Sequence, residues 1–160
     1  MIILFVIGYK AFNGNFTNRS GYKFKVGQTY HVDGAIKWGN NGNGFHICTN
    51  FEECFRYVDS NNFILTEVIG FGKLIKYDDE YNGYFDMYVC ENMRIIRTIS
   101  RKEIIEMAKT LWENRLYNFI RTFNLTDEEA KEIETVSKGK QKILKDIDYY
   151  HNGNKNAYRS

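Results

Sequence analysis

The sequence predicts an α+β protein in which a β-rich segment precedes a helical hairpin. Up to about residue 99, apolar residues occur in short continuous runs or in alternation, with Gly and Asn gathered between the runs. From residue 100 onward, apolar residues recur every three or four positions, the period of an amphipathic helix. We therefore expect a β-rich domain over residues 1–99 with one short helix, a helical hairpin over 100–150 packed on it, and a frayed tail over 151–160.

The β-rich segment is expected to form an antiparallel or mixed sheet. A continuous apolar run over residues 2–9 indicates a strand buried on both faces. The alternating "YKFKVGQTY" of residues 22–30 indicates a half-exposed strand. The segment "FILTEVIGFGKLIKY", residues 63–77, indicates a strand pair with Gly70 and Gly72 as a bulge or bend.

The stretch "NNGNGFHICTNFEECF", residues 40–55, combines a turn, a strand and a helix start. Its Asn-Gly repeats supply the positive φ angles of a tight turn at little steric cost. The strand "FHIC" places His46 and Cys48 on one face. An Asn-x-x-Glu pattern then resembles a capping box and predicts a short helix over residues 51–58.

Two further capping boxes mark the helical segment. The Ser-x-x-Glu pattern at residues 100–103 precedes a long apolar stripe and predicts a helix over 101–122. The Thr-x-x-Glu pattern at 126–129 begins a second helical segment that extends to about residue 150. These two helices make up the predicted hairpin.

Composition narrows the functional classes. The net charge of the 160 residues is +2, which implies no global attraction to nucleic acid. The three cysteines form no CxxC motif, so we expect reduced thiols and a cytoplasmic protein rather than a disulfide framework. The apolar start lacks a basic region and a cleavage site and is too short to span a bilayer, so we expect no membrane association.

Histidines and cysteines suggest two kinds of site, and the spacing disfavours both. His46, Cys48 and Cys54 could begin a zinc site, but the fourth ligand would have to be Cys90 or His31 from far along the chain. Side chains two residues apart on one strand face lie about 6–7 Å apart, which is long for a thiol–imidazole hydrogen bond. No oxyanion-hole pattern accompanies them. We therefore expect no metal and no cysteine nucleophile.

Four segments in order resemble one family of uncharacterised bacterial and phage proteins. They are "GYKAF" (8–12), "YKFKVGQTYHVDGAI" (22–36), "NGFHICTNFEECFRY" (43–57) and "MRIIRTIS" (93–100). They look like the GYKGF…VGKTY…GFHxC core of a domain of unknown function that stands alone in phages and mobile elements or beside pentapeptide repeats. The resemblance covers roughly residues 8–100. It implies a compact β-rich domain in a phage or mobile-element context, without implying an activity.

The order of the early elements is also similar to the split-sheet core of ADP-ribosyltransferases. That resemblance implies an NAD-binding enzyme in which Lys10 and His46 contact NAD and Glu67 or Glu91 stabilises the transition state. The chain departs from the family pattern at two points. A lysine lacks the planar fork of arginine, and neither glutamate lies in a paired-Glu motif. An ADP-ribosyltransferase-like enzyme is therefore the first alternative function.

Nucleic-acid binding is the second alternative. Aromatic and basic residues are interleaved in "GYKFKVGQTY", and "RIIRTISRK" carries four positive charges, including Arg94, Arg97 and Arg101. Base stacking combined with phosphate contacts would use such a pattern.

Protein binding is the leading expectation. Trp112, Tyr117 and Phe119 extend the aromatic surface of the first helix beyond one narrow stripe, and aromatic residues dominate interface hot spots. We therefore expect a non-enzymatic phage or mobile-element protein without a cofactor that binds a host protein or protein–nucleic-acid complex. An anti-defence (anti-CRISPR-like) inhibitor would fit this description, and a homodimer is compatible with it.

Overall fold

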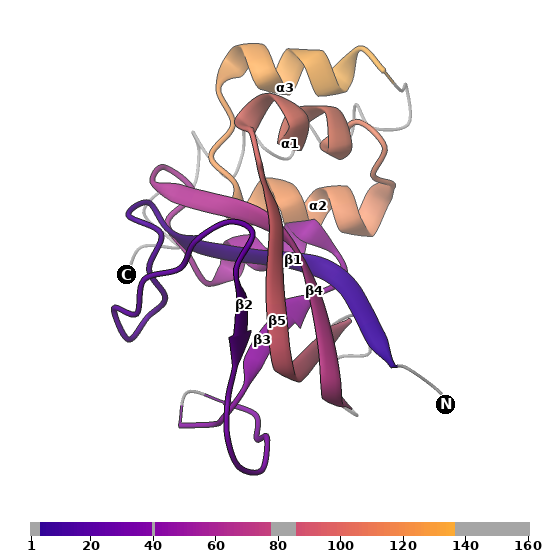
Figure 1. The fold of residues 1–160 in the computed structure, drawn as a ribbon. Coiled ribbons are helices and arrows are strands. Elements are labelled where there is room, and N and C mark those ends of the chain that lie inside the picture. Colours follow the sequence, from indigo (N-terminus) through magenta and orange to yellow (C-terminus); the bar gives the residue numbers. More distant parts are fainter. Residues whose placement is uncertain (1–3, 40, 78–85, 137–160) are drawn as a thin grey trace. The chain divides into compact units, whose positions relative to one another are not determined.

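The computed structural model describes residues 4–39, 41–77 and 86–136. By its internal contacts the chain divides into two compact units, Met1–Ile99 and Ser100–Ser160, here called the β unit and the helical unit. Strands make up most of the first unit and helices the second, so the predicted α+β class with a β-rich N-terminal part is confirmed (Figure 1).

The β unit is built from five antiparallel strands. They are β1 (Phe5–Asn13), β2 (Thr29–His31), β3 (Phe45–Cys48), β4 (Phe63–Lys76) and β5 (Met87–Ile99). The strand order is β2-β5-β3-β1-β4, and β4 also pairs with β5. The first and last strands of the series β5-β3-β1-β4 thus pair with each other, so these four strands form a closed ring. The short strand β2 pairs with β5 outside this series.

The interior of this ring holds the core of the β unit. Strand alternation brings one side of each strand inward. The buried cluster consists of Phe12, Phe24, Tyr30, Ile47, Val68, Cys90, Met93 and Ile95. Its members come from all five strands and from the segment between β1 and β2, so the core fixes how these segments lie against one another.

The seam between β1 and β3 is the weakest part of the ring. β1 pairs with β4 along its whole length, from Phe5 to Asn13. Its register with β3 consists of the single pair Tyr9–Cys48. The two strands therefore diverge after Tyr9, and the barrel opens on this side.

The predicted strand over residues 22–30 is wrong for most of its length. Only Thr29–His31 forms a strand, which is β2. Gly27 has a φ angle of +82°, which interrupts an extended strand, and its N–H donates to the Ile95 carbonyl at 2.8 Å. The alternating pattern therefore predicted correctly that Phe24 is buried, but it predicted the wrong backbone conformation for this segment.

The predicted strand pair over residues 63–77 is one continuous strand, β4. Its pairing with β5 shifts between Phe71 and Leu74, where Gly72 has a φ angle of +84°. The predicted bulge is therefore correct at Gly72. Gly70 instead allows a close approach, because a Cβ there would lie 2.4 Å from the Cys90 sulfur.

A 3₁₀ helix, η1 (Phe51–Arg56), follows β3. The sequence predicted a helix here with Asn50 as its capping residue. Asn50 does occupy the N-cap position, but its side chain makes no capping hydrogen bond. Glu53 pairs with Arg56 at 3.1 Å instead, so the predicted capping box does not form.

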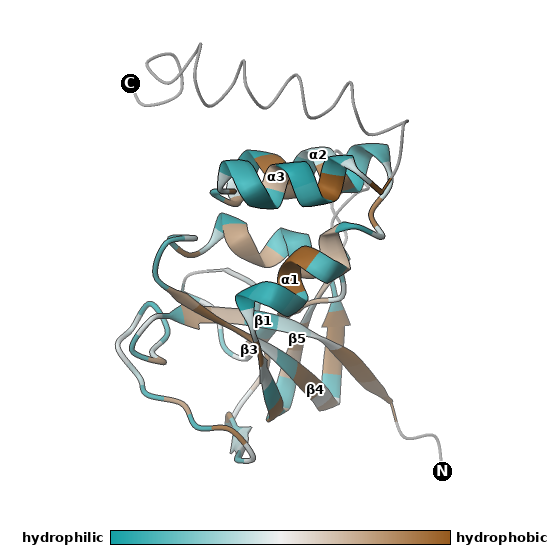
Figure 2. Cartoon of the chain, turned by 90° about the horizontal axis from the view of Figure 1, so that it is seen from above, coloured by the Kyte–Doolittle hydropathy of each residue, from teal (hydrophilic) through white to brown (hydrophobic). Residues whose placement is uncertain are grey.

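The helical unit contains α1 (Arg101–Ala108), α2 (Glu113–Thr122) and α3 (Asp127–Glu134). Each of the helices visible in Figure 2 carries both hydrophilic and hydrophobic residues. The predicted single helix over 101–122 is wrong. Thr110 donates both its N–H (3.1 Å) and its hydroxyl (2.6 Å) to the Met107 carbonyl, which closes a turn and ends α1.

Both capping patterns of the helical unit occupy the predicted positions. Ser100 accepts the N–H of Glu103 at 3.2 Å, and Thr126 with Glu129 forms a complete capping box. The helical segment predicted beyond residue 136 and the tail over 151–160 lie outside the described residues. The packing of a helical hairpin on the sheet stays a prediction. Within the described part of the chain, none of the helices is long and apolar enough to cross a membrane.

Candidate ligand-binding cleft

A cleft of about 890 Å³ opens where β1 and β3 diverge. One wall is the stretch Tyr9–Asn13 of β1, and the opposite wall is the turn and strand from Gly42 to His46. The segment after β1, the strand β2 and the residues around η1 complete its lining. The whole cleft belongs to the β unit.

Lys10 extends its ammonium group into the gap between the diverging strands. Its Nζ donates to the His46 carbonyl at 2.9 Å, an acceptor that a longer β1–β3 ladder would have used. Burial lowers the pKa of Lys10. The described residues that line the cleft include no Asp or Glu. The cleft therefore holds a withdrawn cation without a carboxylate beside it.

His46 places its ring in the same cleft. The Gly39 N–H donates to its Nε2 at 3.3 Å, and the ring meets Trp38 edge-on at 5.3 Å between centroids. Burial and the charge of Lys10 lower the pKa of His46 to about 4. The ring is therefore neutral at pH 7. Because Nε2 accepts a hydrogen bond, its proton lies on Nδ1.

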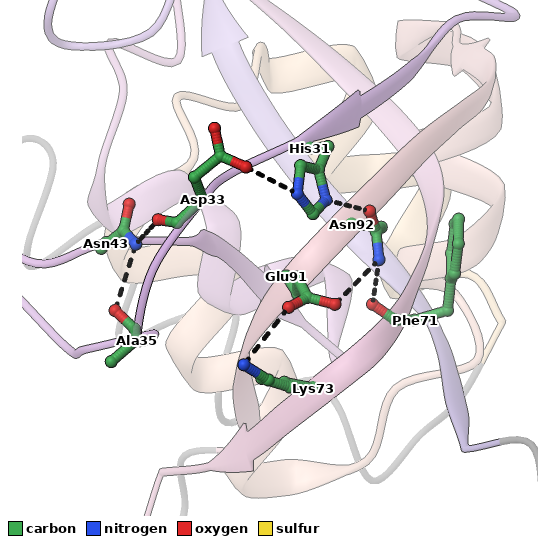
Figure 3. A network of polar contacts seen from close by, with 8 residues as sticks. All are labelled: His31, Asp33, Ala35, Asn43, Phe71, Lys73, Glu91 and Asn92. Carbon is green, nitrogen blue, oxygen red and sulfur yellow. Dashed lines mark hydrogen bonds and ion pairs between the residues drawn. The ribbon is translucent and has the colours of Figure 1, made fainter.

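His31 also borders the cleft, and its pKa is shifted in the opposite direction. Its Nδ1 lies 2.6 Å from Asn92 Oδ1, and its Nε2 lies 3.2 Å from Asp33 Oδ1. Figure 3 shows the ring between these two oxygens. The Asn92 amide nitrogen donates to the Phe71 carbonyl, and this bond orients the Asn92 amide oxygen toward the His31 ring. The Asn92 hydrogen bond, followed by the interactions with Asp33, raises the pKa of His31.

Aromatic side chains form much of the remaining lining. They are Tyr9, Phe12, Tyr22, Phe24, Tyr30, Trp38, Phe45, Tyr57 and Tyr77. Trp38 also contacts Tyr77 edge-on at 4.8 Å, and Tyr22 contacts Phe24 at 5.1 Å. The basic side chains of Arg19 and Arg56 complete the charged part of the lining, and Arg56 is paired with Glu53. The cleft thus combines aromatic surface with positive charge.

Two buried cysteines of the β unit, Cys54 and Cys90, have raised pKa values. Cys48, Cys54 and Cys90 are buried and free. Burial, followed by a hydrogen bond to Cys48, holds the pKa of Cys54 well above its usual range. Burial raises the pKa of Cys90 to about 12. A thiolate nucleophile is therefore disfavoured at Cys54 and Cys90.

The structure joins two of the four residues implied by the ADP-ribosyltransferase resemblance. Lys10 and His46 meet in the cleft, whereas neither Glu67 nor Glu91 lines it. Glu67 pairs with Arg97 at 3.1 Å. Glu91 pairs with Lys73 at 3.7 Å, beside the His31 network (Figure 3). Among the described residues, no group of three His, Cys, Asp or Glu side chains is arranged to hold a metal ion.

The aromatic binding candidates of the helical unit differ in exposure. Trp112 is 73% exposed, whereas Phe119 is fully buried and stacks on Phe123 at 4.8 Å. Tyr117 is half-buried, and the guanidinium of Arg121 lies 5.4 Å from its ring.

The three arginine candidates all have partners. Arg94 donates to Thr29 Oγ1 at 3.2 Å, and Arg97 pairs with Glu67 as described above. Arg101 contacts both carboxylate oxygens of Glu129 at 2.8 Å. These basic residues therefore support the fold of their own units.

Sequence reasoning missed most of the cleft residues. Arg19, Trp38, Tyr57 and Tyr77 line it, but they come from loops and strand ends whose spacing carries no periodic signal. Tyr22 also lines it, and it lies in the alternating stretch that was interpreted as a strand. The signal that could have found them is the family resemblance, because three of the four segments that resemble the uncharacterised family supply much of the lining.

Comparison with known proteins finds one family and no characterised relative. A family model described as "Domain of unknown function (DUF7666)" matches residues 6–107. This match spans every residue described as lining the cleft. No curated protein and no solved structure matches the chain.

Proposed function

We propose that this chain, which belongs to the DUF7666 family of domains of unknown function, is a binding protein whose cleft takes a ligand with a negative charge and an aromatic ring system. Nucleotides have this chemistry. The observation that carries the proposal is the ammonium group of Lys10, withdrawn into the cleft and bonded to a backbone carbonyl. A buried charge is costly unless it is compensated, and a phosphate group would compensate it.

The rest of the lining supports the same ligand class. Ligand clefts are mostly apolar and hold a few polar groups that fix orientation, in volumes of roughly 300–1,000 Å³. The 890 Å³ cleft lies within that range. Its aromatic rings offer faces and edges to a nucleobase, and its basic side chains offer donors to phosphate oxygens.

Binding without catalysis is favoured over ADP-ribosyl transfer. The transferase chemistry implied by the resemblance needs a glutamate beside the bound NAD. Glu67 and Glu91 are engaged with Arg97 and Lys73 outside the cleft, and no described lining residue is a carboxylate. We therefore assign Lys10 a binding role.

The biological setting remains part of the proposal. A nucleotide-class ligand is compatible with a cytoplasmic phage or mobile-element protein that acts on a host protein–nucleic-acid complex, as expected from the sequence. The three free cysteines suit a reducing compartment.

Isothermal titration of the full chain with AMP, adenosine and inorganic phosphate tests this function. We expect AMP to bind more tightly than adenosine, because only AMP carries the phosphate. Lys10→Met should weaken AMP binding about 10-fold or more, since hydrogen bonds to charged groups contribute roughly 1.5–3 kcal/mol. Lys23→Met is the matched control, because Lys23 is exposed and does not line the cleft. Equal affinities for AMP and adenosine, or equal losses in the two variants, would count against the proposal.

A further inference from the structure

We infer that the cleft holds two linked nucleotide units, with the linking phosphate at Lys10 and one base at each end. This inference rests on the proposed function and specifies its ligand as a dinucleotide segment. Such a segment could be a free dinucleotide or two consecutive nucleotides of a single strand, which share the same chemistry.

The first base position lies beside Trp38. This half-buried side chain contacts the rings of His46 and Tyr77, so its indole is held in place by neighbours on two segments. The neutral His46 ring offers hydrogen-bonding groups to a base without adding a second charge. The Lys10 ammonium group donates to the backbone carbonyl of the same His46.

The second base position lies beside Tyr22. Its ring is 58% exposed, although it borders the cleft and contacts Phe24 and Tyr30 with centroid distances of 5.1 and 6.2 Å. A tyrosine held against other rings while most of its surface faces solvent is suited to stacking on a base. Arg19 also lines the cleft and supplies a cationic group, and His31 lines it with a ring whose pKa is raised.

Chains of contacts connect Lys10 to both positions. In one direction, Lys10 bonds to His46, whose ring contacts Trp38. In the other direction, the Lys10 Nζ lies 5.9 Å from the centre of the Phe12 ring. Phe12 contacts Phe24 at 4.8 Å, and Phe24 contacts Tyr22. A single cation flanked by two aromatic groups matches a ligand with a phosphate between two bases.

The test is to titrate the full chain with AMP, NAD⁺, the dinucleotide pApA and a ten-nucleotide poly-dA strand. We expect at least one linked ligand to bind about 10-fold or more tightly than AMP. Tyr22→Ala should bring this ratio close to one while changing AMP affinity less than about twofold. Trp38→Phe should weaken AMP and the linked ligands alike. Phe5→Ala, at an exposed aromatic of β1 that does not line the cleft, is the control and should leave every affinity unchanged.

Each outcome decides a specific point. Tight binding of NAD⁺ or pApA without a further gain for the strand supports a free dinucleotide. A large gain for the strand, with a steep salt dependence, supports single-stranded nucleic acid. AMP binding that equals binding of all linked ligands overturns the inference and leaves the proposed function standing. Absence of binding by AMP and every linked ligand overturns both.

Discussion

Lys10 is the residue at which stability and binding oppose each other. Its half-buried side chain donates to the His46 carbonyl, and desolvation lowers the pKa of Lys10. One backbone hydrogen bond compensates only part of the desolvation of a charged group. Such a group would be retained if a ligand completes its environment.

We predict that Lys10→Met stabilises the unliganded protein while it weakens anion binding. Methionine keeps the length of the side chain and removes the desolvated charge, so the free energy of unfolding should rise by on the order of 1 kcal/mol. Urea unfolding monitored by circular dichroism measures this change. Lys23→Met, at an exposed position, should change stability by less than about 0.5 kcal/mol. A clear loss of stability in Lys10→Met would show that the ammonium group is structurally required.

The two described histidines should titrate on opposite sides of the ordinary histidine value of 6.5. His46, with its pKa near 4, binds fewer protons in the folded than in the unfolded state between pH 6.5 and 4. Its contribution to stability is therefore complete above pH 6.5 and is lost as the pH falls toward 4. The pKa of His31 is raised, so its contribution is complete below pH 6.5 and is lost as the pH rises through its folded value.

Imidazole nitrogen NMR across pH 3–9 measures both values, with His31→Gln and His46→Gln used to assign the signals. A His46 ring that titrates at 6.5 or above would contradict the described cleft. A His31 ring that titrates below 6.5 would contradict its bonds to Asn92 and Asp33.

At the scale of elements, the turn before β3 sets one wall of the cleft. Gly44 has a φ angle of +129°, and a Cβ there would lie 2.6 Å from a Val89 methyl carbon and 3.0 Å from the Cys90 carbonyl oxygen. Gly44 therefore lets β3 lie close against β5 where the cleft wall begins.

We predict that Gly44→Ala destabilises the protein by roughly 2 kcal/mol or more, because an unfavourable φ angle and a steric overlap combine. Gly21→Ala is the matched control, since Gly21 has a φ angle of +81° and a Cβ there would meet no atom within 4 Å. Its cost should be about 1 kcal/mol from the backbone alone. Thermal unfolding of both variants tests the difference, and equal losses would contradict the close approach at Gly44.

In the helical unit, hydrogen bonds from Arg101 connect α1 to α3. Arg101 contacts Glu129 through two hydrogen bonds, and it also donates to the Asn124 carbonyl at 2.6 Å. The hydrogen bonds from Arg101 are the largest cause of the lowered pKa of Glu129. One guanidinium thus joins the start of α1, the loop before α3 and the capping box of α3.

Arg101→Lys should reduce stability at pH 7 by on the order of 1 kcal/mol, because lysine lacks the two-pronged geometry. The contribution of Glu129 is present above its unfolded pKa and is lost as the pH falls through its lowered folded value. The difference between variant and wild type in thermal unfolding should therefore narrow from pH 7 to pH 3. Lys102→Arg, a neighbouring exposed change, is the control. A difference that is independent of pH would argue against the ion pair.

Elements were predictable where sequence pattern and local geometry agree. Apolar runs located β1 and β4, and the Thr126–Glu129 capping box located the start of α3. The predicted burial of the first strand on both faces is wrong, because Phe5 and Ile7 are more than half exposed. The end of α1 was missed because Leu111 fits the helical stripe, although the hydrogen bonds of Thr110 stop the helix. The spacing of apolar residues predicts which side chains are buried, whereas the position of a helix end depends on competing hydrogen bonds.

At the scale of the whole molecule, the cleft could be predicted only in part. Lys10 and His46 were chosen from the sequence, and they do meet. Their meeting depends on the divergence of β1 and β3 after one residue pair, which no local pattern encodes. Trp38 and Tyr22 were not chosen as site residues, because their roles arise from segments that only the barrel brings together.

The most direct test of the account is the titration of the Lys10 ammonium group itself. Heteronuclear NMR of the Lys10 side chain, assigned with Lys10→Met, reports its pKa with and without saturating AMP. We predict a pKa below the ordinary 10.5 in the free protein and a clear rise on addition of AMP, because a bound phosphate stabilises the charged form. A Lys10 pKa that is unchanged by bound AMP, or that already equals the ordinary value, would contradict the claim that Lys10 makes this cleft an anion-binding site.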